Sequence, residues 1–117
     1  MSDTVHTVVL VDPMDGVRDG LRWVLAADTD IVVVAEAHDV ATAARAPGQV
    51  VVSALVLADG VAADLVGLGR PVVVHTWLPA DERPPGAADG AAAVVRHGTL
   101  RARLAAEIRR AAGQSSG

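Results

Sequence analysis

The sequence contains no cysteine, lysine, asparagine, phenylalanine or tyrosine, and its two aromatic residues are both tryptophan. Without cysteine the chain has no disulfide, thiol nucleophile or thiolate-bound metal. Without lysine it has no Schiff base and no ammonium group to pair with a phosphate. Two aromatic side chains are too few for a platform on which single-stranded nucleic acid stacks. These absences exclude several catalytic and binding chemistries.

The charged residues are ten arginines and fourteen acids, which give a net charge of −4 at pH 7. This balance argues against direct nucleic-acid binding, which needs a basic face. No apolar run approaches the roughly 20 residues of a membrane span, and the first ten residues lack the basic segment of a secretory signal. We therefore predict a cytoplasmic protein without membrane contact. A length of 117 residues suits one domain.

Apolar runs alternate with helical patterns along the chain. Strands are predicted at 5–11, 31–35, 50–57, 71–75 and 92–96, and helices from Asp15, at 40–46, at 61–68 and from Leu100. Asp15 and Thr99 are the predicted N-caps. Because the strands are continuously apolar, the run at 31–35 included, they need cover on both faces. This pattern is typical of a parallel sheet in a doubly wound α/β domain.

Two segments depart from this alternation. The stretch 78–90 contains three prolines, and Pro84 and Pro85 disfavour a helix there, so the fourth helix is predicted to be degenerate or missing. Residues 113–117 are predicted to form a flexible tail or the start of a linker. The domain is accordingly predicted to span residues 1–112.

A site in such a fold lies where the carboxyl ends of the strands meet. The sequence places there Asp12 and Pro13, 36–39, 55–59, Thr76 and Trp77, and Arg96 and His97.

The run VVLVDPMDGVRDGLRWVLAADTDIVVVAEAHD resembles the opening of a response-regulator receiver domain, in the branch that usually carries a C-terminal LuxR-type helix-turn-helix. VVVHT resembles the fourth strand of that family, which ends in Ser or Thr, and GAAAVVR resembles its fifth strand. The resemblance implies a flavodoxin-like, five-stranded parallel sheet in the order 2-1-3-4-5. It also implies a role in two-component signalling and transcription regulation.

The departures from the family pattern concern its phosphorylation site. Receivers hold magnesium with an acid pair, phosphorylate an aspartate at the end of the third strand, and neutralise the phosphoryl group with a lysine after the fifth. Matched to this pattern, the acid pair becomes Asp12–Pro13, the acceptor position is Ala54, and the lysine position is His97, or Arg96 in the adjacent register; the threonine position is kept by Thr76. The resemblance therefore implies a pseudo-receiver with a degenerate pocket.

Phosphoryl transfer to a carboxylate needs that carboxylate and a divalent cation. Ala54 cannot accept a phosphoryl group; Asp59 is the alternative acceptor, although an Asp-Gly pair after a strand is typical of a turn. We predict no catalytic residue, no cofactor and no metal, since His6, His38 and His97 lack metal-ligand spacing.

The remaining conspicuous side chains are interpreted one by one. His75 is expected in the core. Trp77 either plugs the degenerate pocket or anchors a partner. Trp23 is interpreted as packed at the edge of the core, with an exposed interface tryptophan as the alternative. The arginines of the last helix are expected on a solvated face, namely Arg101, Arg103, Arg109 and Arg110.

These observations predict an atypical receiver that acts without phosphorylation, by binding a protein partner or by forming a homodimer. The alternative is the small-molecule-sensing domain of a truncated LuxR-type DNA-binding transcription factor, in which a DNA-binding domain would follow residue 117. Its ligand would lie in the crevice between Asp12, Thr76, Trp77 and His97.

Overall fold

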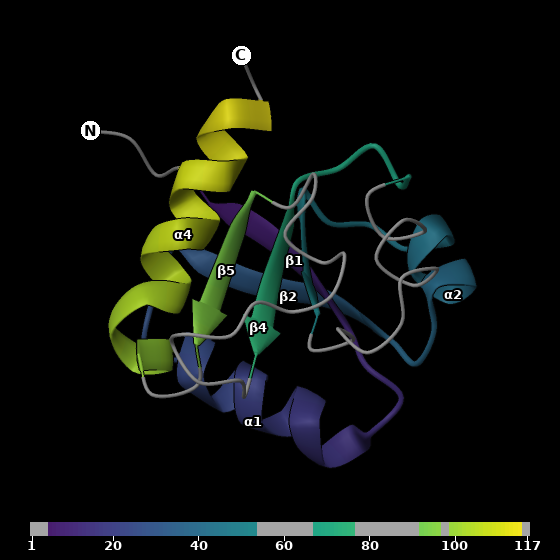
Figure 1. Ribbon diagram of the computed structural model, residues 1–117, viewed down its shortest axis with the longest axis horizontal. Coiled ribbons are helices and arrows are strands. Elements are labelled where there is room, and N and C mark those ends of the chain that lie inside the picture. The colour runs from purple at the N-terminus through teal and green to yellow at the C-terminus, as the bar shows by residue number, and fades with distance from the viewer. Residues whose placement is uncertain (1–4, 54–66, 77–91, 97–98, 116–117) are drawn as a thin grey trace.

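A five-stranded parallel sheet forms the centre of the molecule (Figure 1). The computed structural model describes residues 5–53, 67–76, 92–96 and 99–115. The strands are β1 (His6–Val11), β2 (Ile31–Ala37), β3 (Val50–Ser53), β4 (Val72–Thr76) and β5 (Ala93–Arg96), and the described helices are α1 (Asp15–Leu25), α2 (Val40–Arg45) and α4 (Leu100–Ser115). The strand order β2-β1-β3-β4-β5 and the parallel pairings confirm the predicted fold class.

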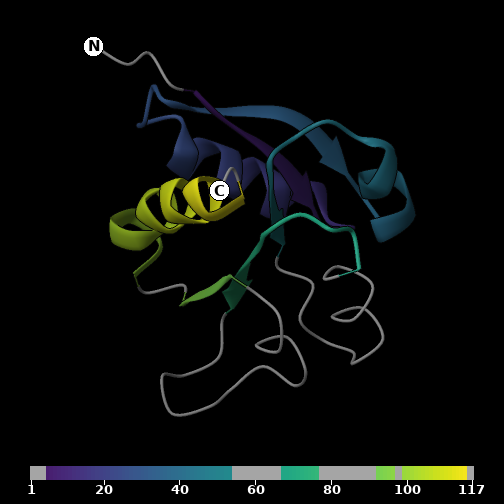
Figure 2. The same cartoon turned by 90° about the horizontal axis from the view of Figure 1, so that it is seen from above.

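Two apolar cores lie on opposite faces of the sheet. Side chains alternate along a strand, so β1 sends Val8 and Leu10 to one face and Val9 and Val11 to the other. The first face packs against α1 and α4 and the second against α2, which Figure 2 shows on the other side of the strands. A strand covered on both faces needs apolar residues at every position, which explains the unbroken run in β1.

The edge strand β2 corrects one expectation. Double cover was predicted for residues 31–35, but the side chains of Val32 and Val34 are exposed. Val33 pairs with Val8 and Ala35 with Val9, so Val34 is the extra residue of a β-bulge. An edge strand has a neighbour on one side only, and the bulge turns part of its apolar run outward.

The start of α1 also differs from the prediction, because Met14 rather than Asp15 is the N-cap and makes no side-chain cap hydrogen bond. The residue that turns the chain is Asp12, whose Oδ1 accepts the Met14 backbone N–H at 2.8 Å. At α4, Thr99 precedes the first residue as predicted, and its hydroxyl donates to the Arg96 carbonyl at 3.1 Å. Both helix starts are thus tied to the end of the preceding strand.

The link from α2 to β3 is held by Arg70, which comes from the segment before β4. Its guanidinium donates to the carbonyls of Ala43 at 2.7 Å, Ala46 at 3.0 Å and Gly48 at 3.1 Å, and so satisfies acceptors at the end of α2. Gly48 has a φ of +135°, and a Cβ there would lie 2.9 Å from the Val9 backbone nitrogen. Glycine is therefore required at this position both by conformation and by space.

Of the arginines expected on the solvated face of the last helix, Arg103 and Arg110 are exposed as predicted, whereas Arg109 is half-buried and paired. Its guanidinium binds Asp30 in a bidentate manner, at 2.7 and 2.9 Å, and also the Asp28 carboxylate at 2.7 Å. The hydrogen bonds from Arg109 lower the pKa of Asp30 from its ordinary 3.8 to about 2, and the two carboxylates raise the pKa of Arg109. This cluster ties α4 to the loop between α1 and β2.

The end of α4 lies further along the chain than expected. Residues 113–115 are helical, whereas the sequence predicts an irregular tail from Gly113. Gly113 has no positive φ, so it does not end the helix as a left-handed cap. The predicted helix at 61–68 and the proline-rich stretch at 78–90 fall largely or wholly outside the described residues. Within the described ranges, no helix has the length and apolar character that crossing a membrane requires.

Replacing Gly48 with alanine should lower the free energy of unfolding by roughly 1–3 kcal/mol, because the positive φ is strained for alanine and its Cβ meets the Val9 backbone. Gly20→Ala is the matched control, since Gly20 lies in α1 with nothing within 4 Å of its Cβ position. It should raise stability by about 0.5–1 kcal/mol through helix propensity. Urea denaturation of both variants checks this, and equal effects would contradict it.

Stability should fall in acid partly through Asp30. A carboxyl whose pKa is lower in the folded chain contributes stability above its unfolded pKa, and that contribution is lost as the pH falls from about 4 through about 2. Asp30→Asn should therefore flatten the fall in melting temperature in this window. Melting curves of both chains between pH 2 and 6 test this, and parallel profiles would refute it.

Candidate functional site

The carboxyl ends of the strands form one edge of the sheet, where a site was predicted. Val11 pairs with Ala37 on one side and with Ser53 on the other, and the last residues of β4 and β5, Thr76 and Arg96, pair with each other. Asp12 follows β1 and is 5% exposed, and its N–H donates to the Ala37 carbonyl at 3.0 Å. The predicted convergence of strand ends is therefore present in the described residues.

The Asp12 carboxylate already has an internal partner at this edge. Its Oδ1 accepts the Met14 N–H, which closes a turn between β1 and α1. Pro13, between them, supplies neither a carboxylate nor a backbone N–H. The one acidic group at the end of β1 thus shapes the chain, and the next residue along the chain supplies no second carboxylate.

Two arginines of α1 cover this edge, and sequence reasoning did not identify them. Arg18 donates to the Asp12 carbonyl at 2.7 Å and to Glu36 of β2 at 3.2 Å, and it also binds Asp15. Arg22 binds the same Glu36, and Asp19 at 2.6 Å. The Asp15–Arg18 and Asp19–Arg22 spacings are visible in the sequence as i,i+3 pairs. The contacts with Glu36 depend on how α1 packs on β2, which no local spacing reveals.

The other strand ends combine buried polar groups with an arginine. Ser53 and His75 are both buried, the latter as predicted for a core histidine. Arg96 is half-buried at the end of β5. The placements of Ala54, Asp59, Trp77 and His97 lie outside the described residues, so the complete predicted pocket stays a prediction. In ranges 5–53, 67–76, 92–96 and 99–115, no three metal-binding side chains gather into a group.

Trp23 lies on α1 with 64% of its surface exposed, which contradicts the interpretation that it packs at the edge of the core. The buried residues of α1 are Leu21 and Leu25. The side chains of residues two apart on a helix point about 200° away from each other, so Trp23 points away from the side on which Leu21 and Leu25 are buried. The exposed alternative is the one that the structure supports.

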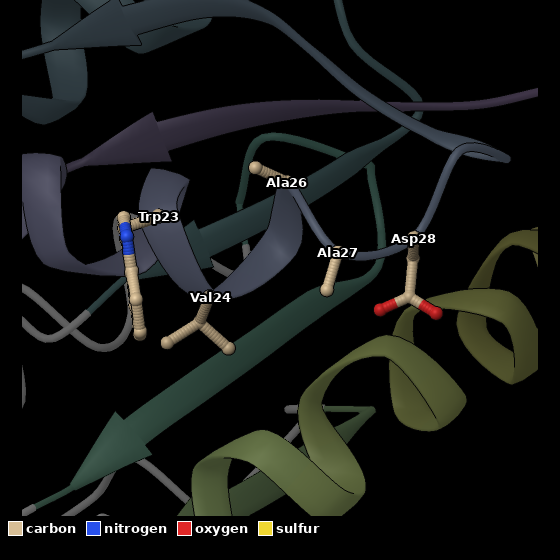
Figure 3. Close-up of a pocket in the computed structure, with 5 residues that line it drawn as sticks. All are labelled: Trp23, Val24, Ala26, Ala27 and Asp28. Carbon is tan, nitrogen blue, oxygen red and sulfur yellow. The ribbon is translucent and has the colours of Figure 1, made fainter.

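A shallow pocket of about 440 Å³ lies beside Trp23 and is lined also by Val24, Ala26, Ala27 and Asp28 (Figure 3). These residues belong to the end of α1 and the loop before β2. The pocket follows the end of α1 into the loop before β2, and none of the predicted crevice residues lines it. It is therefore separate from the predicted crevice around Asp12.

Comparisons with known proteins agree on the fold. No protein-family model matches the chain, and no curated protein matches it. A LuxR-family two-component response regulator from Aurantimonas sp. SI85-9A1 superposes with a TM-score of 0.77 at 22% identity, covering 95% of this chain and 87% of its own. A CheY-like receiver domain protein from Methanospirillum hungatei JF-1 gives 0.72 at 14% identity, covering 97% and 98%.

The response regulator RcsB of Salmonella typhimurium gives a TM-score of 0.69 at 17% identity. The match covers 98% of this chain but 62% of RcsB, so the chain spans less than two thirds of that protein. Similar structures are thus response-regulator receiver domains, which bears out the predicted architecture. At these identities the similarity establishes the fold.

Proposed function

We propose that this chain is a receiver-like signalling domain that acts through protein–protein contact, by self-association in particular, without aspartyl phosphorylation. The observation that carries this proposal is the use of Asp12. Its carboxylate is held by the Met14 N–H, and its carbonyl is held by Arg18. The acidic residue at the end of β1 therefore takes part in the turn that starts α1, through its carboxylate and its carbonyl.

The composition supports the same conclusion from another direction. Magnesium prefers about six oxygen ligands in octahedral geometry, and Pro13 stands where a second carboxylate would help to supply them. Ala54, which follows β3 directly in the sequence, has no group to phosphorylate. The chain also has no lysine to pair with a phosphoryl group, whichever of Arg96 and His97 is aligned to that position.

A signal that does not depend on phosphorylation must be carried by contacts between surfaces. Trp23 is the strongest contact residue among the described side chains, because an indole is a frequent energetic centre of protein interfaces. The solved RcsB structures include one of two dimers bound to two parallel DNAs, which shows self-association in a protein of this fold. We accordingly propose a homodimer that buries Trp23.

The remaining predictions about function belong to this proposal. The domain, predicted to span residues 1–112 and extended by α4 to Ser115, is not an enzyme and takes no cofactor, and it works in the cytoplasm without direct nucleic-acid contact. Its degenerate pocket consists of Asp12, Pro13, Ala54, Thr76, Arg96 and His97, with Trp77 as a plug or a contact residue. A net charge of −4 supports a protein partner rather than a nucleic acid.

Incubation with acetyl phosphate and MgCl2 should leave the intact mass of the chain unchanged. The reason is that the proposed pocket has neither an acceptor carboxylate at Ala54 nor a second acid at Pro13 to help bind magnesium. Mass spectrometry measures this, with a receiver that retains the acid pair and the acceptor as a positive control. A phosphoryl group mapped to Asp59 or to any other aspartate of this chain would overturn the proposal.

Trp23→Ala should weaken self-association by about thirtyfold or more, as expected for the loss of 2 kcal/mol at an interface centre. Its melting temperature should stay close to that of the natural chain, because the side chain is exposed. Met14→Ala is the matched control, since Met14 is equally exposed, at 64%, but lies at the opposite end of α1. Sedimentation equilibrium decides the matter. A chain that stays monomeric at high concentration, or two variants that dissociate alike, would contradict the Trp23 dimer.

A further inference from the structure

Arg18 occupies an unusual position among the charged residues of α1. Three segments meet at its guanidinium, namely the end of β1 through the Asp12 carbonyl, the start of α1 through Asp15, and β2 through Glu36. The side chain is 13% exposed, which is rare for an arginine. Its donors are directed at the part-buried Asp12 carbonyl, at the partly exposed Glu36 carboxylate and at the exposed Asp15 carboxylate.

Arg22 provides a comparison within the same helix. It binds Glu36 as well, but its second partner is Asp19 on α1, one turn earlier, and its side chain is 51% exposed. None of its described contacts reaches β1. Two arginines therefore share one carboxylate, yet Arg18 is the one that joins both strand ends to the helix.

The chemistry of these partners calls for a permanent cation. A carbonyl oxygen and two carboxylates brought together repel one another, so a positive charge among them stabilises the arrangement. A guanidinium remains charged throughout the pH range of folded proteins, and its planar set of N–H groups binds several oxygens at once.

We propose that Arg18 is the built-in counter-cation of the carboxyl edge, which makes the junction of β1, β2 and α1 independent of metal ions. The guanidinium performs structurally what a bound divalent cation does for converging oxygen ligands. This inference goes beyond the proposed function, because it concerns how the edge is held together and does not depend on whether any aspartate is phosphorylated.

Removal of the guanidinium should change the ion dependence of the fold. In Arg18→Gln, the Asp12 carbonyl and the carboxylates of Asp15 and Glu36 lose their cation, and these are hard oxygen donors of the kind that bind Mg²⁺ and Mn²⁺. We expect the melting temperature of this variant in EDTA to fall by roughly 5 °C or more. Millimolar MgCl2 or MnCl2 should restore part of that loss, while the natural chain should not respond.

Two control variants separate the charge of Arg18 from its other properties. Arg22→Gln removes a neighbouring charge from Glu36 and should cause a smaller loss that divalent cations do not restore. Arg18→Lys keeps a cation in place and should also remain insensitive to Mg²⁺. Melting curves in EDTA, MgCl2 and NaCl of equal ionic strength distinguish a bound cation from general screening.

The outcomes leave the proposal open to refutation. If Arg18→Gln does not fold in EDTA, MgCl2 or the added substitution Glu36→Gln should recover it, and failure of both would overturn the proposal. If Arg18→Gln and Arg22→Gln lower the melting temperature equally and divalent cations restore neither, Arg18 forms only an ordinary ion pair and the proposal is wrong. A natural chain stabilised by Mg²⁺ as strongly as the variant would also refute it. None of these results depends on the phosphodonor experiment, so the two proposals fail separately.

Discussion

The structure depends on the burial of β1 between two apolar layers. Its last four residues, Val8 to Val11, are fully buried, and the strand pairs with β2 on one side and β3 on the other. The fully buried positions of β1 are all apolar, and the first charged side chain after them is Asp12, where the strand ends.

The two edges consequently have separate roles. At the carboxyl edge, Asp12 and Arg18 join β1 to α1, and both groups are held by partners from their own chain. At the amino edge, Arg109 joins α4 to the loop before β2, and on α1 Trp23 stands exposed beside a pocket. The contacts of Asp12 and Arg18 support the proposal that the carboxyl edge has a structural role, and the exposure of Trp23 supports the proposal that the end of α1 meets a partner.

The parallel sheet could be predicted from the sequence because the apolar runs are long and continuous. A strand that is apolar at every position fits a sheet covered on both faces. The strand order was also implied by the resemblance of the first forty residues to receiver domains, and the structure confirms it. The details that failed concern residues whose role is set by distant partners. Asp15 looked like a helix cap, but the bond from the Asp12 carboxylate to the Met14 N–H sets the start of α1.

The arginines show the same distinction between local pattern and packing. Arg109 looked solvated from its helical spacing, since Asp28 and Asp30 lie about eighty positions earlier in the chain. The sequence left the exposure of Trp23 open, because the spacing of residues on α1 does not show whether another element packs against that side of the helix. Of the candidate pocket, the contacts of Asp12 are described, whereas those of Ala54 and His97 remain predictions that rest on the sequence.

The bulge in β2 has a consequence for how molecules of this protein can associate. Val34 interrupts the regular ladder of the strand that ends the sheet on that side. An irregular edge is a poor template for a strand from another chain, because successive N–H and C=O groups are no longer evenly presented. Growth of the sheet by strand addition is therefore disfavoured at β2, although Val32 and Val34 are apolar and exposed. The protein is thus protected on this side from indefinite stacking.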